Sequence, residues 1–229
     1  QKADMATESM AAVAGGVTSF IDMPNTRPAT VTMEAVVAKM ARAAEVSVAN
    51  YGFFIGATND NLDQLLDADY TCVAGVKLFL GSSTGNMLVD NDSTLDRIFA
   101  EVPALIAVHA ESESVIAASR ERLLKECGGS IPVMRHPDVR PREACVEATR
   151  HAVEMAERHG SRLHVMHIST ADELGFFTPG PVEGKRITAE TCPQYLTFDR
   201  GDFERLGSRI KCNPAIKERS DRDALRVAV

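Results

Sequence analysis

The sequence lacks the features that would place it in a membrane or among secreted, disulfide-bonded proteins. No run of about 18 apolar residues occurs, so no segment is expected to span a bilayer. The five cysteines are odd in number, widely spaced and without a CxxC pair, which argues against a disulfide framework and against a structural zinc knot. We therefore expect no membrane partner and a reducing, cytoplasmic location.

An excess of basic residues is also missing. The formal net charge is -7 and the isoelectric point is about 5.4, whereas nucleic acids and anionic membranes select basic surfaces. We therefore expect no nucleic-acid partner. A small-molecule substrate remains compatible with this charge, even an anionic one, because a few local cations and amides can hold it.

What the sequence does contain is an alternation of strand-like and helix-like segments. With 229 residues, of which 45% are apolar and 25% charged, the chain can bury a sizeable core, and we predict a single domain over residues 1–229. Six short apolar runs look buried on both faces, as parallel strands are. These runs cover residues 17–23, 51–57, 75–81, 105–111, 162–169 and 186–192.

Helix candidates separate these runs. One begins after Pro141 and ends at Gly160, and another begins at Thr32, which can act as its N-cap. The predicted helices cover residues 32–44, 61–68, 95–101 and 142–159, together with the shorter stretches 172–177, 202–206 and 221–229.

This alternation is compatible with an open doubly wound sheet or with a (β/α)8 barrel. A doubly wound sheet usually carries a glycine-rich phosphate loop after its first strand, and residues 23–26 form no such loop. A barrel places its chemistry at the C-terminal ends of several strands, where the candidate residues fall. We therefore predict an α/β fold of the (β/α)8 TIM-barrel type.

Three titratable residues, Lys77, His109 and His167, lie at or near the ends of three different predicted strands. A buried charge or imidazole is costly unless it is paired or binds a metal. One such histidine alone would be interpreted as a hydrogen-bonded core residue. Two histidines and a lysine at equivalent strand ends favour a metal site instead.

The other four histidines are predicted to serve no site. His164 lies three residues before His167, so the two face opposite sides of the strand, and we expect His164 to pack against a helix. His151 and His159 fall on the long predicted helix and His136 in a polar loop, where we expect all three to be solvated.

Six segments, in this order, resemble the dihydroorotase branch of the cyclic amidohydrolases: DMPNT (22–26), GVKLFLGSSTGN (75–86), VHAES (108–112), RLHVMHIST (162–170), ETCPQYLTF (190–198) and KCNPAIK (211–217). The resemblance covers nearly the whole chain. It implies a distorted (β/α)8 barrel that houses two divalent metal ions, usually Zn²⁺. We also expect a homo-oligomer, namely a dimer.

The family's first-strand HxH, its substrate-binding arginine and its eighth-strand aspartate have no counterpart in these residues. The resemblance therefore implies that the chain holds strands two to seven. The sequence also begins at Gln1, without an initiator methionine or a signal pattern. We accordingly expect the central part of a longer protein.

The resemblance assigns roles to the three strand-end residues. Lys77 resembles the lysine that carbon dioxide carboxylates and that bridges both metals, a reaction that requires a neutral amine. Without the family it would be interpreted as a buried lysine paired with an acid. His109 and His167 resemble two histidine ligands of the second metal.

Two asparagines and one cysteine are further candidates for the site. Asn25 resembles an asparagine that holds the substrate carboxylate, although a turn or helix cap would also explain it. Asn213 resembles a second asparagine that contacts the substrate ring, and without the family it would be only a loop residue before Pro214. Cys192 has no basic partner tied to it by spacing, so we interpret it as a small buried residue and not as a nucleophile.

The resemblance implies a dihydroorotase, which interconverts L-dihydroorotate and N-carbamoyl-L-aspartate in pyrimidine biosynthesis. An allantoinase or a dihydropyrimidinase/hydantoinase-like hydrolase is the alternative, because these branches share the HAE, lysine and ETCP-type segments. A non-catalytic barrel homologue is a third possibility. The joint presence of Lys77, His109 and His167 argues against that third reading.

Overall fold

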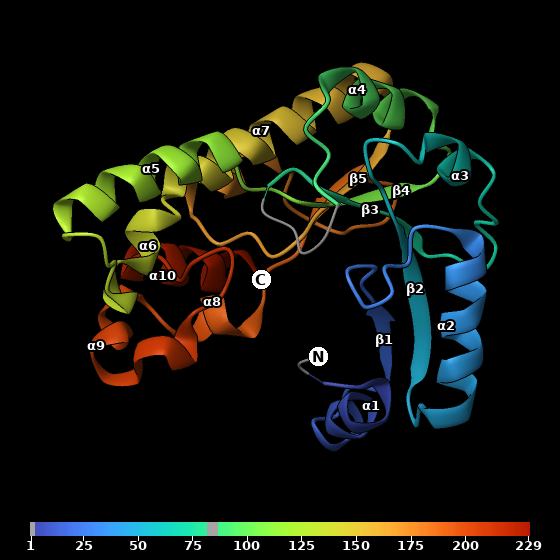
Figure 1. Cartoon of the computed structure of the whole chain (residues 1–229), viewed down its shortest axis with the longest axis horizontal. Coiled ribbons are helices and arrows are strands. Elements are labelled where there is room, and N and C mark those ends of the chain that lie inside the picture. Colours follow the sequence, from blue (N-terminus) through green and yellow to red (C-terminus); the bar gives the residue numbers. More distant parts are fainter. Residues whose placement is uncertain (1–2, 82–86) are drawn as a thin grey trace. The chain divides into compact units, whose positions relative to one another are not determined.

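The computed structural model describes residues 3–81 and 87–229 (Figure 1). The end of the GVKLFLGSSTGN segment, residues 82–86, therefore lies outside the described residues. The described chain separates into two compact units, each treated by itself below. The first comprises residues 3–79 and 87–107, and the second comprises residues 80–81 and 108–229.

The first unit alternates helices and strands. Its elements are α1 (Met5–Ala14), β1 (Ser19–Asp22), α2 (Met33–Val46), β2 (Asn50–Gly56), α3 (Leu62–Leu66), β3 (Gly75–Phe79), α4 (Asp92–Glu101) and the start of β4 (Leu105–His109). Helix α2 begins where the sequence predicts, because the Thr32 hydroxyl accepts a hydrogen bond from the amide of Ala35. It packs beside β2 (Figure 1).

The second unit contains the end of β4 and the rest of the chain. Its further elements are α5 (Glu113–Glu126), the 3₁₀ turn η1 (Val133–Arg135), α6 (His136–Val139), α7 (Arg142–His159), β5 (Arg162–Val165), η2 (Asp172–Phe176), β6 (Ile187–Ala189), α8 (Pro193–Thr197), η3 (Arg200–Asp202), α9 (Phe203–Leu206), η4 (Gly207–Ile210) and α10 (Arg219–Ala228). Helix α7 has the predicted bounds. It ends at Gly160, whose φ of 67° is the left-handed conformation that favours glycine.

All six predicted strands are present, and the order β1-β2-β3-β4-β5-β6 follows the order in the chain. The pairs β1–β2, β2–β3 and β5–β6 are parallel. A doubly wound sheet reverses its strand order at a switch point, and no reversal occurs among the described strands. The fold is therefore α/β with a sequential parallel sheet, as expected for part of a (β/α)8 barrel.

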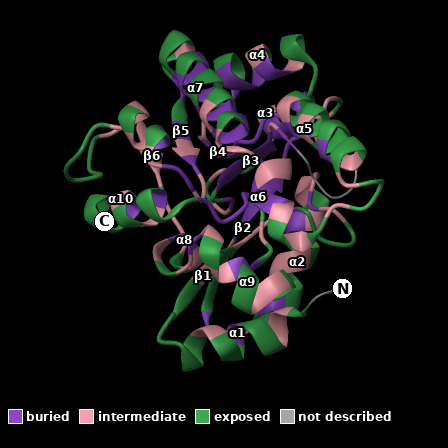
Figure 2. Cartoon of the chain, turned by 90° about the vertical axis from the view of Figure 1, so that its left-hand side faces the viewer, coloured by how far each residue is buried: buried purple, intermediate pink, exposed green. Residues whose placement is uncertain are grey.

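Burial on both faces is confirmed for β3 and β4 and is wrong for β1 and β6, whereas β2 and β5 are buried only in part. All five residues of β3 are buried, as are the last four of β4 (Figure 2). The residues of β1 are exposed or half-buried instead. Among the described strands, β1 pairs only with β2, so one of its edges has no neighbouring strand to cover it.

Besides the short helices α6 and α8, the sequence patterns missed two longer ones, α1 and α5. Each buries only one or two side chains, so its apolar periodicity is weak. N-caps define their starts: the Asp4 carboxylate accepts from the amide of Thr7, and the Ser112 hydroxyl accepts from the amide of Val115. Within the described residues, no helix is both long enough and apolar enough to cross a membrane.

Candidate metal centre

The structure brings two of the predicted site residues together at the ends of neighbouring strands of the second unit. His109 is the last residue of β4, and His167 follows the end of β5 by two residues. The Nδ1 atom of His109 lies 2.9 Å from the Nε2 atom of His167. The two rings meet edge to face, with their centroids 4.7 Å apart.

A buried carboxylate holds the other nitrogen of His109. Oε2 of Glu111 lies 2.9 Å from His109 Nε2 and 2.5 Å from Nη1 of Arg140, which precedes helix α7. Because the carboxylate accepts the Nε2 proton, a neutral His109 turns its Nδ1 lone pair towards His167. The Glu111–Arg140 ion pair therefore fixes the orientation of the His109 ring.

The ionisation of Glu111 follows from its surroundings. Burial by itself would raise the pKa of this carboxyl group. The hydrogen bond from His109 and the positive charges of Arg140 and Lys217 outweigh burial and hold the pKa below its usual value. Glu111 is therefore a carboxylate at neutral pH, as an acceptor for His109 must be.

A glycine allows the backbone to approach this carboxylate residue. A Cβ atom added at Gly81 would come within 2.0 Å of the carbonyl oxygen of Glu111. The amide of Leu80 also donates to the carbonyl of His109, at 3.1 Å. The short segment before the undescribed residues therefore lies directly against the end of β4, where only glycine fits.

The donor set of the histidine pair suits a divalent metal. Two nitrogens bound to one Zn²⁺ at about 2.0–2.1 Å in tetrahedral geometry lie about 3.3 Å apart. The pair at 2.9 Å would need to open by only a few tenths of an ångström. In the described part of the chain, however, no three His, Cys, Asp or Glu side chains gather into a complete ligand cluster. The pair can supply two ligands and needs others.

Lys77, the third predicted site residue, is in the middle of β3 in the first unit. Its side chain is only 2% exposed. The Nζ atom donates to the carbonyl of Leu78 at 3.0 Å and lies 4.1 Å from the centroid of the Phe79 ring. These contacts bury the lysine amine against a backbone carbonyl and the face of an aromatic ring. Its carboxylation and its bridging role stay predictions.

The two asparagines predicted to bind substrate are both exposed. Asn25 lies in the loop after β1, which the Thr26 hydroxyl closes by donating to the carbonyl of Pro28 at 2.8 Å. Asn213 precedes α10, and its Oδ1 atom lies 3.1 Å from Nε2 of His136. The role of each in substrate binding stays a prediction.

Of the four histidines expected outside the site, one clearly differs from expectation. His136 is buried and not solvated, because its Nε2 atom contacts the carbonyl of Cys212 as well as Asn213. Burial lowers the pKa of His136, which favours the neutral ring. The Nδ1 atom of His164 lies 2.9 Å from the hydroxyl of Thr188 in β6, and its packing against a helix stays a prediction. Of the two helical histidines, His151 is exposed as predicted and His159 is half-buried.

Cys192 is half-buried at the N-cap of α8, and burial raises the pKa of its thiol. A raised pKa keeps the thiol protonated, so the structure gives no support to a nucleophilic role.

Glu111 and Arg140 both contribute to the site, although neither is among the site residues predicted from the sequence. The signal for Glu111 was present in the VHAES segment, because residues two apart in an extended chain point to the same side. Arg140 lies far from that segment along the chain, and only the fold places it there.

No protein-family model matches the chain. Curated relatives do match it. An allantoinase from Streptomyces avermitilis is 35% identical over 227 residues, which cover 96% of this chain and 49% of that protein. An allantoinase from Deinococcus radiodurans is 33% identical over 217 residues, which cover 93% of this chain and 48% of that protein. The chain thus spans about half the length of the curated relatives it matches.

Solved structures of hydantoinases superpose on nearly the whole chain. The L-hydantoinase (dihydropyrimidinase) from Arthrobacter aurescens superposes with a TM-score of 0.88 at 27% identity, covering 97% of this chain and 50% of that one. A D-hydantoinase superposes with a TM-score of 0.82 at 28% identity, covering 98% of this chain and 50% of that one.

These relatives bear out the broad resemblance and favour the alternative over dihydroorotase. The segments that suggested dihydroorotase include the strand-end lysine and histidines. By the resemblance, such residues are common to the branches, so they do not select one ring over another. The sequence therefore indicated the class of chemistry more securely than the substrate.

Proposed function

We propose that this chain forms the metal-binding middle part of a cyclic-amide hydrolase that opens hydantoin-type rings, with allantoin as the first candidate substrate. Allantoin is itself a hydantoin that carries a ureido group, so the allantoinases and hydantoinases among the relatives act on related five-membered rings. The sequence relatives at 33–35% identity are named allantoinase, which favours allantoin.

One observation carries the proposal: His109 Nδ1 and His167 Nε2 lie 2.9 Å apart, with Glu111 behind the first ring. A divalent metal held there would polarise the ring carbonyl and lower the pKa of a bound water, which is what amide hydrolysis needs. The role of the protein is to present two neutral imidazole nitrogens in a fixed orientation. The Glu111–Arg140 pair, itself buried, provides that orientation.

The remaining predicted residues enter the proposal with definite roles. Lys77, carboxylated by carbon dioxide, would supply the negative charge and the two oxygens of a bridge between two divalent ions. Asn213 accepts from His136 through Oδ1, which leaves its amide N–H groups to donate to a ring carbonyl. Allantoin has no carboxylate, so Asn25 would hydrogen-bond an uncharged polar group and not an anion.

A substrate panel tests the proposal. The full-length protein is assayed on allantoin, hydantoin, dihydrouracil and dihydroorotate, before and after removal of metal with a chelator. We expect allantoin to be hydrolysed fastest, and we expect Zn²⁺ to restore activity after chelation. A protein that prefers dihydroorotate, or that keeps full activity without metal, would refute the proposed function.

A further inference from the structure

His167 has an unusual backbone. Its φ is 44°, and among the described residues it is the one non-glycine residue with a positive φ. The left-handed conformation is strained for a residue that carries a side chain. Such a conformation persists only where the surrounding structure enforces it.

The residues on both sides of His167 are bonded to neighbouring strands. The amide of Met166 donates to the carbonyl of Val108 at 3.0 Å. The amide of Ile168 donates to the carbonyl of Glu190 at 2.9 Å, and the carbonyl of Ile168 accepts from the Thr191 hydroxyl at 2.9 Å. The chain is therefore fixed immediately before and immediately after the histidine.

The next residues are held by a buried carboxylate, that of Glu173, which is 2% exposed. Its Oε2 atom accepts from the amide of Ser169 at 3.0 Å, from the amide of Thr170 at 3.0 Å and from the hydroxyl of Thr170 at 2.9 Å. Its Oε1 atom accepts from the hydroxyl of Thr149 on α7 at 2.9 Å. Glu173 thus links the loop after His167 to helix α7 through hydrogen bonds.

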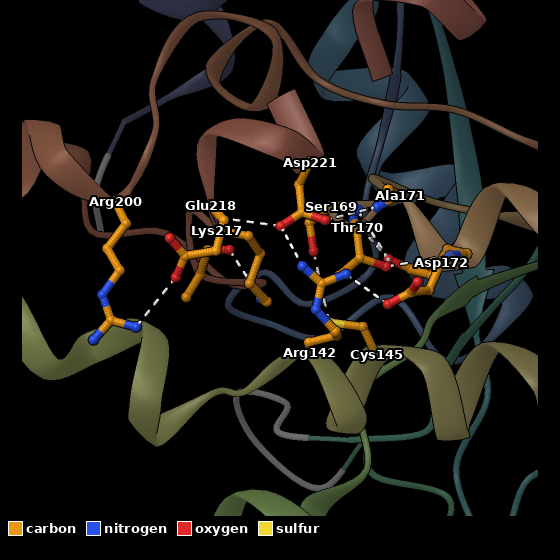
Figure 3. Close-up of polar contacts among 12 residues, drawn as sticks. Arg142, Cys145, Ser169, Thr170, Ala171, Asp172, Arg200, Lys217, Glu218 and Asp221 are labelled. Atoms are coloured by element: carbon orange, nitrogen blue, oxygen red, sulfur yellow. Dashed lines mark hydrogen bonds and ion pairs between the residues drawn. The ribbon is translucent and has the colours of Figure 1, made fainter. Parts of the chain in front are cut away.

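A second buried carboxylate, that of Asp221, holds the end of this loop, as Figure 3 shows. Oδ1 of Asp221 accepts from the amide of Ala171 at 2.9 Å, while its Oδ2 atom lies 2.6 Å from Arg142 Nη2. Arg142 also pairs with Asp172. The end of the loop is therefore anchored independently of Glu173, so loss of Glu173 would free mainly residues 169–170.

We propose that Glu173 is a positioning residue, whose carboxylate keeps His167 in its left-handed conformation and so aims Nε2 of His167 at the site shared with His109. This inference rests on the proposed metal-binding function. Three of the four bonds to the carboxylate come from the residues two and three positions after His167. Without them, two amides and a hydroxyl lose their acceptor, and His167 can relax to an ordinary φ that turns the ring away from its partner.

The experiment measures metal affinity and global stability separately. Zn²⁺ affinity of the folded full-length protein is determined by competition with a chromophoric chelator, and stability by urea unfolding of the metal-free protein. Glu173→Ala should weaken Zn²⁺ binding about 10–100-fold, the loss usual for a group that orients a ligand. If Glu173→Ala does not fold, Glu173→Asp serves instead, because its side chain is one methylene too short to reach the loop.

Rescue and a matched control distinguish positioning from simple stabilisation. Glu173→Gln should keep affinity near that of the parent, because its amide oxygen can accept the three loop bonds while its N–H₂ donates to Thr149. Asp199, 7% exposed, is a similarly buried carboxylate that accepts from the amide of Gly201 and from Arg222. Asp199→Ala should lower stability without changing the affinity of the folded protein.

The outcomes separate the two proposals. A parent protein that binds Zn²⁺ tightly, together with a folded Glu173→Ala or Glu173→Asp variant of equal affinity, would overturn the positioning role alone. A parent protein that binds no metal would overturn the proposed function and this inference with it.

Discussion

Replacing Arg140 by alanine should remove the countercharge of a fully buried carboxylate. The side chains of Glu111 and Arg140 are 0% and 7% exposed, so solvent screens this ion pair little. Glu111 would keep its bond to His109 and the more distant charge of Lys217. Truncating one partner of a buried pair costs about 3–5 kcal/mol. We expect the free energy of unfolding of the metal-free protein to fall by that amount.

Urea unfolding followed by circular dichroism, at neutral pH, measures this loss. Arg150→Ala is the matched control on α7, because Arg150 pairs with Glu154 at 3.0 Å with both side chains about half exposed. Such a pair contributes at most about 0.5 kcal/mol. The double variant Glu111→Gln/Arg140→Ala should recover part of the loss, since no buried charge is then left unpaired. A loss in Arg140→Ala no larger than that in Arg150→Ala would refute the reasoning.

Three further predictions concern the backbone, the thiol and the lysine. Gly81→Ala should lower Zn²⁺ affinity in the chelator competition, because the added Cβ would displace the carbonyl of Glu111. Gly160→Ala is the control and should leave the affinity unchanged, because its added Cβ contacts nothing and only the left-handed backbone is strained. Cys192→Ser should hydrolyse allantoin at the parental rate, and a loss of all activity would revive the nucleophile interpretation. Lys77→Ala and Lys77→Arg should both lose bound metal and activity, since neither side chain can be carboxylated, and an active Lys77→Arg protein would exclude the carboxylated bridge.

Much of the fold could be predicted from the sequence because strands buried on both faces leave a plain signal. The run around β3 is apolar throughout except for Lys77, and helix α7 carries both its start and stop residues, Pro141 and Gly160. Helix α5 escaped notice because it lies on the surface and is defined mainly by its cap at Ser112. Strand β5 ends four residues earlier than predicted, at Val165, because the following residues turn through the left-handed conformation at His167.

The site could be predicted from the sequence only for residues whose type is unusual for their surroundings along the chain. His109 and His167 stand out as imidazoles in apolar strands. Arg140 does not, because its guanidinium looks like any surface cation until the fold buries it against Glu111. His136 is a similar case. The polar segment around it predicts a solvent-exposed side chain, whereas tertiary contacts bury the ring beside Asn213.

Metal stoichiometry tests the central claim most directly. The full-length protein and its His109→Asn, His167→Asn and His164→Asn variants are purified in the presence of Zn²⁺, and bound metal per chain is measured by plasma mass spectrometry. His164 is the control, because it is an imidazole of β5, three residues before His167, that contacts Thr188 instead of the pair. We predict that the parent and His164→Asn bind metal equally and that His109→Asn and His167→Asn each lose it. Equal metal content in all four proteins would contradict the account.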